Sequence, residues 1–337
     1  MKYTLFGRSG LRVSEIALGT MTFGTEWGYG ADKTESQKIF ETYANAGGNF
    51  IDTANRYTEG TSEKFIGDFI HSDRDHFVVA TKYSLQDRLN DPNFSGNHRK
   101  NMMRSLNESL KRLNTDFVDI LWLHVWDSLT PMDEILRGLD DLVRSGKVNY
   151  IAISDTPAWQ VSRANTMAEL RGWNAFIGLQ VEYSLLQRTP ERDLIPMAKE
   201  MGLALTPWAP MAGGALSGKY LKGEQGRVKE NSTRRNENSN RIAEKVVEVA
   251  TKMGDTPAQV AIRWVMQKDF TSIPIVGCRN HQQLAESLKA TEIIIPNELM
   301  KELDEISKVE LGFPHDFLTS EAVKMGLYGG TLDKLKI

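Results

Sequence analysis

Four polar residues in the first half of the chain have the side-chain types needed for proton transfer. Asp52 closes a short apolar segment, and Tyr57 follows in a polar loop that contains glycine. Lys82 and His124 each follow a longer apolar run. Any one of them alone is compatible with a purely structural role. An acid, a lysine and an imidazole closing three successive apolar segments instead predict one shared cavity.

These side chains suggest a specific chemistry. A free tyrosine has a pKa of about 10 and is a poor acid near neutrality. An ammonium beside Tyr57 is expected to lower that pKa and to improve the phenol as a general acid. Asp52 would keep a buried Lys82 charged and oriented, and His124 would polarise a carbonyl by hydrogen bonding. Together they predict protonation of an aldehyde or ketone oxygen as a hydride reaches its carbon.

The elements that position these residues follow a regular alternation of apolar strands with helical patterns. The predicted strands are 15–19, 50–52, 77–81, 117–123, 149–153, 177–180, 202–206 and 273–276. Eight such units favour an α/β protein of the (β/α)8 TIM-barrel class, whose active site lies at the carboxyl ends of the strands. An N-terminal β-hairpin is predicted at 2–14, and no linker divides the single domain expected over residues 1–337.

Several helix boundaries carry recognisable signals. Thr-Pro pairs predict helix starts, with the hydroxyl as cap and the proline at the first helical position. These pairs lie at 130–131, 156–157, 189–190 and 256–257. Thr256 and Gln259 also fit a capping box. The segment 209–237 has no strong pattern, which is typical of a functional or mobile loop. A helix is predicted near 297–308. The tail that follows it, 311–337, could fold over one barrel mouth.

Composition excludes some partners. A net charge of −3 over 337 residues gives no electrostatic reason to expect nucleic acid or an anionic membrane. No apolar run has the length of a membrane span, and the first residues lack the pattern of a signal peptide. The single cysteine, Cys278, fits a reducing compartment. A cytoplasmic protein is therefore predicted. The six histidines show no metal spacing, so no metal is expected.

The order of several short motifs resembles that of the aldo-keto reductase family. These motifs are Gly-Arg-Ser-Gly-Leu-Arg-Val-Ser (7–14), Gly-Thr-Met-Thr-Phe-Gly (19–24), Gly-Gly-Asn-Phe-Ile-Asp-Thr-Ala (47–54), Asp-Asp-Leu-Val-Arg-Ser-Gly-Lys-Val (140–148), Gln-Val-Glu-Tyr-Ser-Leu (180–185) and Leu-Ser-Gly-Lys-Tyr (216–220). Asp52, Tyr57, Lys82 and His124 match the family's catalytic tetrad in type and order. The resemblance covers nearly the whole chain and implies a barrel that depends on a nicotinamide cofactor.

The resemblance also implies a cofactor site. Ser154, Asp155 and Gln180 would hold the carboxamide, and Trp208 would stack on the nicotinamide ring. The family more often has Asn at the place of Asp155, which can accept a hydrogen bond but cannot donate one when ionised. The other implied cofactor contacts are Gly19, Thr20, Met21, Asp52, Ala209, Pro210, Met211, Gly213, Leu216, Lys219, Arg234, Gly277, Arg279, Gln283, Glu286 and Ser287.

Positive charge favours one form of the cofactor. Arg279 and Lys219, together with Arg234, suit a 2′-phosphate, so NADPH/NADP⁺ is favoured while NADH remains possible. The predicted substrate contacts are Trp27, Tyr57, His124 and Trp126, with Phe313 and Phe317 of the tail as further candidates for the mouth. Such a pocket suits small aldehydes, sugars or ring ketones, or the corresponding alcohols. The oligomeric state stays open.

Three alternatives remain at this point. One is a cofactor-binding regulatory module resembling potassium-channel β subunits, although those relatives carry Asn at the place of His124. Another is a barrel lyase that uses Lys82 as a Schiff-base nucleophile. The third is a phosphate-binding loop, because residues 213–219 match G-x-x-x-x-G-K, but Tyr220 stands where Ser or Thr would bind Mg²⁺. The absence of G-x-G-x-x-G after a strand argues against a Rossmann domain.

Overall fold

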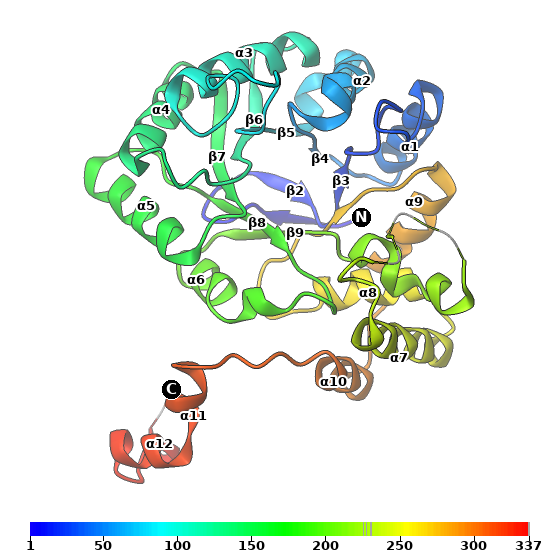
Figure 1. Ribbon diagram of the computed structural model, residues 1–337, viewed down its shortest axis with the longest axis vertical. Coiled ribbons are helices and arrows are strands. Elements are labelled where there is room, and N and C mark those ends of the chain that lie inside the picture. The colour runs from blue at the N-terminus through cyan, green and yellow to red at the C-terminus, as the bar shows by residue number, and fades with distance from the viewer. Residues whose placement is uncertain (225, 227, 230, 336–337) are drawn as a thin grey trace.

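Eight parallel strands curve into a nearly closed barrel (Figure 1). The computed structural model describes residues 1–335 apart from positions 225, 227 and 230. The strands are β3 (Ala17–Gly19), β4 (Phe50–Asp52), β5 (Val78–Tyr83), β6 (Val118–Leu123), β7 (Val148–Ser154), β8 (Gly178–Glu182), β9 (Ala204–Trp208) and β10 (Ile275–Val276). Strand β10 pairs with β3, and a parallel bridge between Leu205 and Ser272 brings the other edge close. The predicted (β/α)8 barrel is confirmed.

The predicted N-terminal hairpin is also present and lies at the amino ends of the barrel strands. Strands β1 (Tyr3–Leu5) and β2 (Arg12–Ser14) pair antiparallel. The fully buried ring of Phe6, in the turn between them, meets Phe50 and Trp122 edge-on at 5.5 and 6.2 Å. This aromatic cluster fills the barrel's amino end, which leaves the opposite end for a site.

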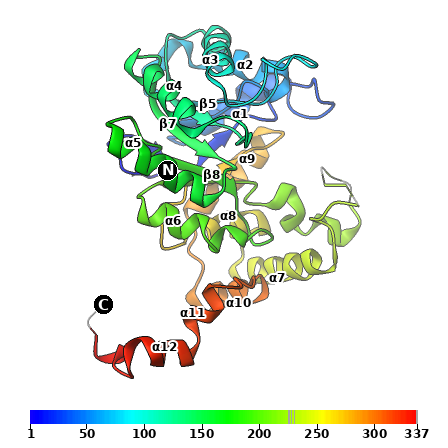
Figure 2. The same ribbon diagram turned by 60° about the vertical axis from the view of Figure 1, so that its left-hand side comes forward.

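Helices cover the outside of the sheet in the order of the chain (Figures 1 and 2). They are α1 (Lys33–Asn45), α2 (Thr61–Ile70), α3 (Arg99–Leu113), α4 (Met132–Arg144), α5 (Ala158–Arg171), α6 (Leu194–Glu200), α7 (Glu237–Met253), α8 (Pro257–Met266), α9 (His281–Leu288) and α10 (Asn297–Ile306). Helix α7 packs on α8, and α10 packs on α7. Within the described residues, no helix has both the length and the apolarity required to span a bilayer.

The capping predictions are confirmed at one of the four Thr-Pro pairs and wrong at the other three. At 189–190, Thr189 is itself the first residue of the 3₁₀ turn η3 (Thr189–Glu191), and Arg188 occupies the capping position without a side-chain hydrogen bond. At α8, the Thr256 side chain and Gln259 form the predicted capping box. At α4 and α5 the proline itself occupies the capping position, so each helix begins one residue later than predicted. The threonine hydroxyls are used elsewhere: Thr130 donates to Asp127, and Thr156 donates to the Ser154 carbonyl. The tertiary partners of these hydroxyls therefore override the local capping signal.

The loop after β9 and the C-terminal tail differ in how they relate to the barrel. The loop contains two 3₁₀ turns, η4 (Ala212–Ser217) and η5 (Lys219–Lys222), that lead into α7. The tail contains α11 (His315–Thr319), α12 (Glu321–Tyr328) and the turn η7 (Leu332–Lys334), and it projects away from the barrel in both views (Figures 1 and 2). The possibility that the tail folds over a barrel mouth, which the sequence left open, is therefore not realised. Positions 336–337 lie outside the described residues.

Candidate active site

The carboxyl ends of adjacent strands bring the four predicted catalytic residues together. Asp52 is the last residue of β4, Lys82 lies one residue before the end of β5, and His124 follows β6 directly. Parallel pairing sets Gly19 of β3 beside Asp52 and thereby fixes their level along the barrel axis. Tyr57 joins them from the short 3₁₀ turn η1 (Tyr57–Gly60), which connects β4 to α2.

Lys82 is the centre of this cluster, and its side chain is fully buried. Its ammonium donates to the Asp52 carboxylate, to the Thr53 carbonyl at 2.9 Å and to the Tyr57 hydroxyl at 3.0 Å. The other carboxylate oxygen of Asp52 accepts from Gln180 Nε2 at 3.0 Å. All three protons of the ammonium therefore have acceptors, which orients Lys82 rigidly.

The electrostatics keep Lys82 charged. Burial alone would lower the pKa of Lys82, but the Asp52 carboxylate and the Tyr57 phenol reverse that effect and raise it above its ordinary value. A Schiff base requires a neutral amine as nucleophile. An ammonium held by three acceptors is poorly suited to that role, so this geometry argues against the lyase alternative.

The pKa of Tyr57 moves in the direction opposite to the sequence-based prediction. Although part of its surface stays exposed, desolvation raises the pKa of Tyr57 above its ordinary value, and the Lys82 ammonium only partly opposes the rise. The Asp52 charge adds to the increase. Tyr57 is therefore a protonated phenol at neutral pH. Because its oxygen accepts from Lys82, its own proton remains available for donation toward the barrel mouth.

His124 lies on the other side of the phenol as a neutral imidazole. Its ring centroid is 6.0 Å from that of Tyr57, with the rings at 83°. Desolvation and then the Lys82 charge hold the pKa of His124 well below its ordinary value. Its backbone N–H lies within hydrogen-bonding distance of the Tyr83 carbonyl and the Ser84 hydroxyl, at 3.0 and 3.1 Å. A neutral imidazole keeps one N–H donor and one acceptor, so it can polarise a substrate oxygen without carrying charge.

The two predicted substrate tryptophans have different surroundings. Trp27 lies edge-on to Tyr57, with centroids 6.5 Å apart, and its indole donates to Glu59 at 3.1 Å. Trp126 packs edge-on against Trp159 of α5, with centroids 6.0 Å apart. Trp27 is therefore a direct neighbour of the phenol. Trp126 has a packing partner of its own, and its contact with substrate stays a prediction.

Residues predicted to hold the nicotinamide carboxamide lie at the ends of β7, β8 and β9. Ser154 pairs with Gln180 across the β7–β8 ladder, and Asp155 follows in the left-handed region with φ of 42°. The Trp208 indole donates to the Asp155 carboxylate at 3.2 Å. Asp155 therefore accepts a hydrogen bond from Trp208, which an ionised carboxylate can do. The side-chain amide of Gln180 donates to Asp52.

The predicted cofactor contacts on β3, β9 and β10 include glycines that allow close packing of the backbone. These three strands are neighbours in the barrel, so residues 19–21, 209–216 and 277–279 lie at one rim. A Cβ at Gly19 would come within 2.6 Å of Ile275, and one at Gly277 within 3.2 Å of the Gly19 carbonyl. Gly213, at φ of 69°, adopts a backbone conformation that other residues rarely use. Packing within the chain therefore requires glycine at 19 and 277, and contact between this rim and the cofactor stays a prediction.

Several side chains at that rim form hydrogen bonds within the protein or pack in its core. The Thr20 hydroxyl donates to the Asp52 carbonyl at 3.1 Å, and Leu216 is fully buried in the core. At α9, the Gln283 side chain accepts from the Arg279 backbone N–H at 3.2 Å. Arg279 thus lies beside the N-terminus of a helix, where the helix dipole favours anions. The remaining predicted contacts near these strands and α9 are Met21, Ala209, Pro210, Met211, Glu286 and Ser287.

The positively charged residues predicted to contact the cofactor differ in whether a carboxylate compensates their charge. Arg234 forms an ion pair with Glu182 at the end of β8, and its guanidinium lies 5.8 Å from the Trp208 ring. That pairing compensates the charge of Arg234 near the predicted nicotinamide position. Arg279 and Lys219 are therefore the better candidates for contact with a 2′-phosphate.

Two contacts at the site had not been predicted. The Thr53 carbonyl holds Lys82, and the Ser84 hydroxyl accepts from the backbone N–H of His124. A backbone carbonyl leaves no signal in a sequence, because every residue has one. Ser84 had a weak signal, since it is a polar residue that directly follows β5.

The fold and the site together define a (β/α)8 barrel with a buried Asp52–Lys82–Tyr57 cluster and a neutral His124 at the carboxyl ends of its strands. The model of the Aldo/keto reductase family matches residues 15–308, and the chain belongs to this family. It is accordingly an oxidoreductase that acts on carbonyl or alcohol groups and uses a nicotinamide cofactor. The resemblance inferred from the sequence is confirmed.

Three relatives are similar to this chain over most of their length. An aryl-alcohol dehydrogenase [NADP(+)] of Phanerodontia chrysosporium is 38% identical over 329 residues, covering 91% of this chain and 86% of the relative. A norsolorinic acid reductase of Aspergillus flavus is 34% identical, with 93% of this chain and 83% of the relative covered. An uncharacterized oxidoreductase, YrpG, of Bacillus subtilis is 36% identical and covers 91% and 96% respectively.

Proposed function

We propose that the protein reduces aromatic aldehydes or ketones with NADPH, or oxidises the corresponding alcohols. The observation that carries the proposal is the 3.0 Å hydrogen bond from Lys82 Nζ to the Tyr57 hydroxyl, within a buried cluster that includes Asp52. The position of Trp27, edge-on to Tyr57, supports a planar substrate. The names of two relatives, an aryl-alcohol dehydrogenase and a norsolorinic acid reductase, support the aromatic class.

The proposed mechanism assigns one task to each member of the cluster. The bound cofactor supplies the hydride in reduction and accepts it in oxidation. Tyr57 donates its proton to the carbonyl oxygen, and Lys82 stabilises the phenolate that this transfer leaves. His124 donates a hydrogen bond to the same oxygen, and Asp52 keeps Lys82 charged and in place. In the reverse direction, the Tyr57 phenolate takes the proton of the alcohol.

The proposal includes a preference for NADPH over NADH. Ser154, Asp155 and Gln180 would hold the carboxamide, Trp208 would lie against the ring, and Arg279 with Lys219 would contact the 2′-phosphate. Comparing the dissociation constants of the two reduced cofactors by calorimetry tests the preference. Tighter binding of NADPH is expected, and equal affinities would contradict it.

A substrate panel tests the central claim. Aryl aldehydes, aliphatic aldehydes, sugars and polyols are compared under identical conditions, with turnover followed as the change in NADPH absorbance. We expect the highest kcat/KM for aryl carbonyls or their alcohols. A preference for sugars would contradict the aromatic class, and tight NADPH binding without turnover of any carbonyl would favour the regulatory-module alternative.

We further propose that residues 1–337 form one catalytic domain that works in the cytoplasm. The single eight-stranded barrel sheet and the buried state of Cys278 are compatible with that proposal. A fluorescent fusion followed by cell fractionation tests the location.

A further inference from the structure

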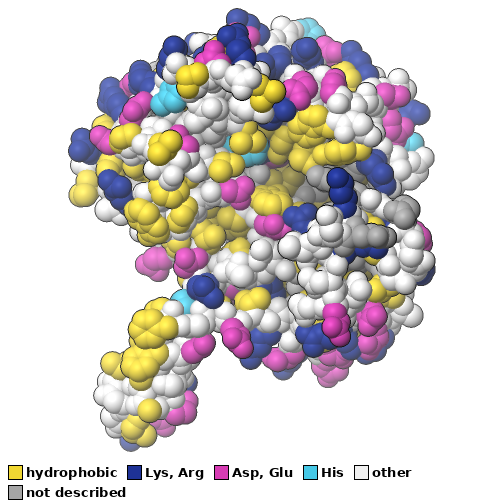
Figure 3. Space-filling view, in the orientation of Figure 1, with side chains coloured by type: hydrophobic (Ala, Val, Ile, Leu, Met, Phe, Trp, Pro, Cys, Tyr) yellow, Lys and Arg dark blue, Asp and Glu magenta, His cyan; other side chains and the backbone are white. Residues whose placement is uncertain are grey.

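The C-terminal arm, defined here as residues 311–335, exposes far more apolar surface than a solvated segment requires. None of the residues of α11, α12 or η7 is buried. Seven large apolar side chains of the arm are exposed: Phe313, Phe317, Leu318, Met325, Leu327, Tyr328 and Leu335. Figure 3 shows hydrophobic side chains gathered on this projection. Contiguous apolar surface of this kind marks an interaction site.

The arm's own barrel does not cover it. Arg188 fixes the end of α10 by donating to the Asp304 carbonyl at 2.6 Å and to the Ser307 hydroxyl at 2.9 Å. Arg192 then reaches the Glu310 carbonyl at 3.3 Å, just before the arm begins. From that anchor the arm leaves the barrel in both views, with α11 and α12 packed on each other (Figures 1 and 2). The anchor therefore directs the arm away from its own barrel.

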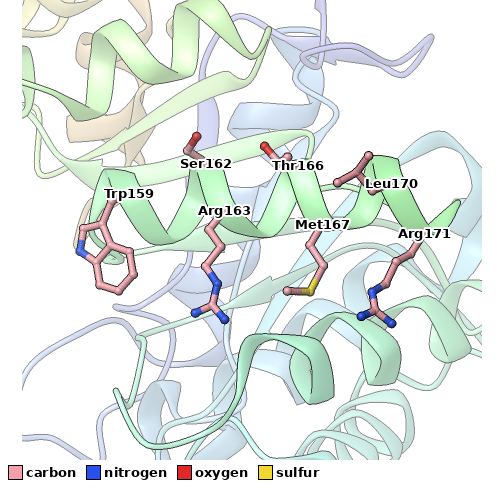
Figure 4. A pocket seen from close by; sticks show the side chains of 7 residues that line it. All are labelled: Trp159, Ser162, Arg163, Thr166, Met167, Leu170 and Arg171. Carbon is pink, nitrogen blue, oxygen red and sulfur yellow. The ribbon is translucent and has the colours of Figure 1, made fainter.

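The same chain carries an open groove along the outer face of α5 (Figure 4). Its volume is about 580 Å³, and it is lined by Trp159, Ser162, Arg163, Thr166, Met167, Leu170 and Arg171. These residues recur at intervals of three and four, so they form one stripe of the helix. Trp159 and Leu170 are 61% and 82% exposed. The stripe thus combines the apolar side chains of Trp159, Met167 and Leu170 with two hydroxyls and two guanidinium groups, and it leaves room for side chains from outside.

We propose that the arm of one copy docks in the α5 groove of a second copy, and that the second copy reciprocates. The apolar side chains of the arm match the apolar floor of the groove. Glu321 is paired with Lys324 inside the arm at 3.0 Å. The remaining acidic residues of the arm, Asp316 and Asp333, outnumber its remaining lysine, Lys334, and so match the charges of Arg163 and Arg171. Each chain has one arm and one groove, so two reciprocal contacts close a two-fold dimer. The inference concerns assembly and does not depend on the proposed reaction.

Charge and separation favour a second copy over the arm's own groove. Helix α5 lies away from the point where the arm leaves α10 in both views (Figures 1 and 2). The chain also has a net charge of only −3, so two copies repel each other weakly. An exchanged arm is a low-cost route to a dimer, because each contact is made twice.

Engineered cysteines give the sharpest test, because the only native cysteine, Cys278, is buried. The variants Leu170→Cys and Phe317→Cys are mixed and oxidised. We expect a disulfide-linked dimer from the mixture. Phe317→Cys mixed with Leu89→Cys, at a site that is 73% exposed on a different loop, should give little cross-linking. A double variant that closes its disulfide within one chain would overturn the proposal.

Solution mass supplies the second readout. Light scattering of the native chain should give a dimer, and both Leu170→Asp and Phe317→Asp should weaken dimerisation at least tenfold. Leu89→Asp is the matched control and should leave the mass unchanged. A monomeric native chain, or a dimer that survives Leu170→Asp, would overturn the proposal. Trp159 is left unaltered because it contacts Trp126, a predicted substrate residue.

Discussion

Lys82 Nζ lies 3.0 Å from the Tyr57 hydroxyl and 4.6 Å from the centroid of the Tyr57 ring. The ammonium therefore contacts both the atom that loses a proton and the ring that spreads the resulting charge. In the resting protein, desolvation keeps the phenol protonated despite this contact. In the proposed mechanism, the cation stabilises the phenolate when proton transfer creates it, which is where stabilisation would accelerate the reaction.

Removing the phenol oxygen is the most direct test of the mechanism. Tyr57→Phe should lower kcat by about 10²- to 10⁴-fold, because a positioned general acid contributes on that scale. The affinity for NADPH, measured by calorimetry, should change little. Tyr3→Phe is the matched control, since that exposed hydroxyl lies on the N-terminal hairpin and donates to the Gly47 carbonyl at 2.8 Å. Full activity of Tyr57→Phe would refute the assignment.

Removing the ammonium should affect stability as well as rate. Lys82→Met leaves the Asp52 carboxylate buried without its cation, and loss of one partner of a buried pair costs about 3–5 kcal/mol. The double variant Asp52→Asn/Lys82→Met leaves no buried charge, so most of the free energy of unfolding should return while activity does not. Urea unfolding measures both effects.

The exposed pair Lys33–Asp68 provides the control for that experiment. Its side chains are 55% and 58% exposed, so Lys33→Met should change the free energy of unfolding far less than Lys82→Met. Equal losses for the two variants would mean that burial of the Lys82–Asp52 pair has no energetic consequence.

The pH dependence of reduction follows from the two displaced pKa values. Desolvation lowers the pKa of His124 below 6.5 and raises that of Tyr57 above 10.0. Between these pH values His124 is neutral and Tyr57 is protonated, so the reductive kcat/KM should be flat. Activity should fall as the pH drops through the depressed His124 value or rises through the elevated Tyr57 value. A change of kcat/KM with pH between these two values, if it disappears in the variant His124→Asn, would contradict this prediction.

The cofactor preference can be tested at one residue. Arg279→Gln should weaken NADPH binding by about ten- to hundredfold, because hydrogen bonds to a charged group contribute roughly 1.5–3 kcal/mol. Binding of NADH, which lacks the 2′-phosphate, should change little. Arg241→Gln removes the same charge from an exposed position on α7 and serves as the control. Equal losses for both cofactors would place Arg279 away from the 2′-phosphate.

Local sequence patterns were sufficient where the deciding physics is local. The alternation of apolar strands with helices predicts the barrel, because periodicity records which face each element buries. Thr256 and Gln259 predict the start of α8, because both partners of the capping box lie within one helical turn. The end of a strand is also a local feature, so Asp52, Lys82 and His124 could be recognised as neighbours before their contacts were known.

Long-range geometry decided the rest. The pKa of Tyr57 depends on how much water the assembled barrel excludes, and no nearby sequence encodes that balance between desolvation and the Lys82 charge. The hydroxyls of Thr130 and Thr156 bond outside the helices that they were predicted to cap. The direction of the C-terminal arm depends on where Arg188 anchors α10. The sequence alone therefore determined the barrel and the set of reactive groups. Only the tertiary structure decided the protonation of these groups and the path of the arm, because desolvation and anchoring arise from residues far apart in the chain.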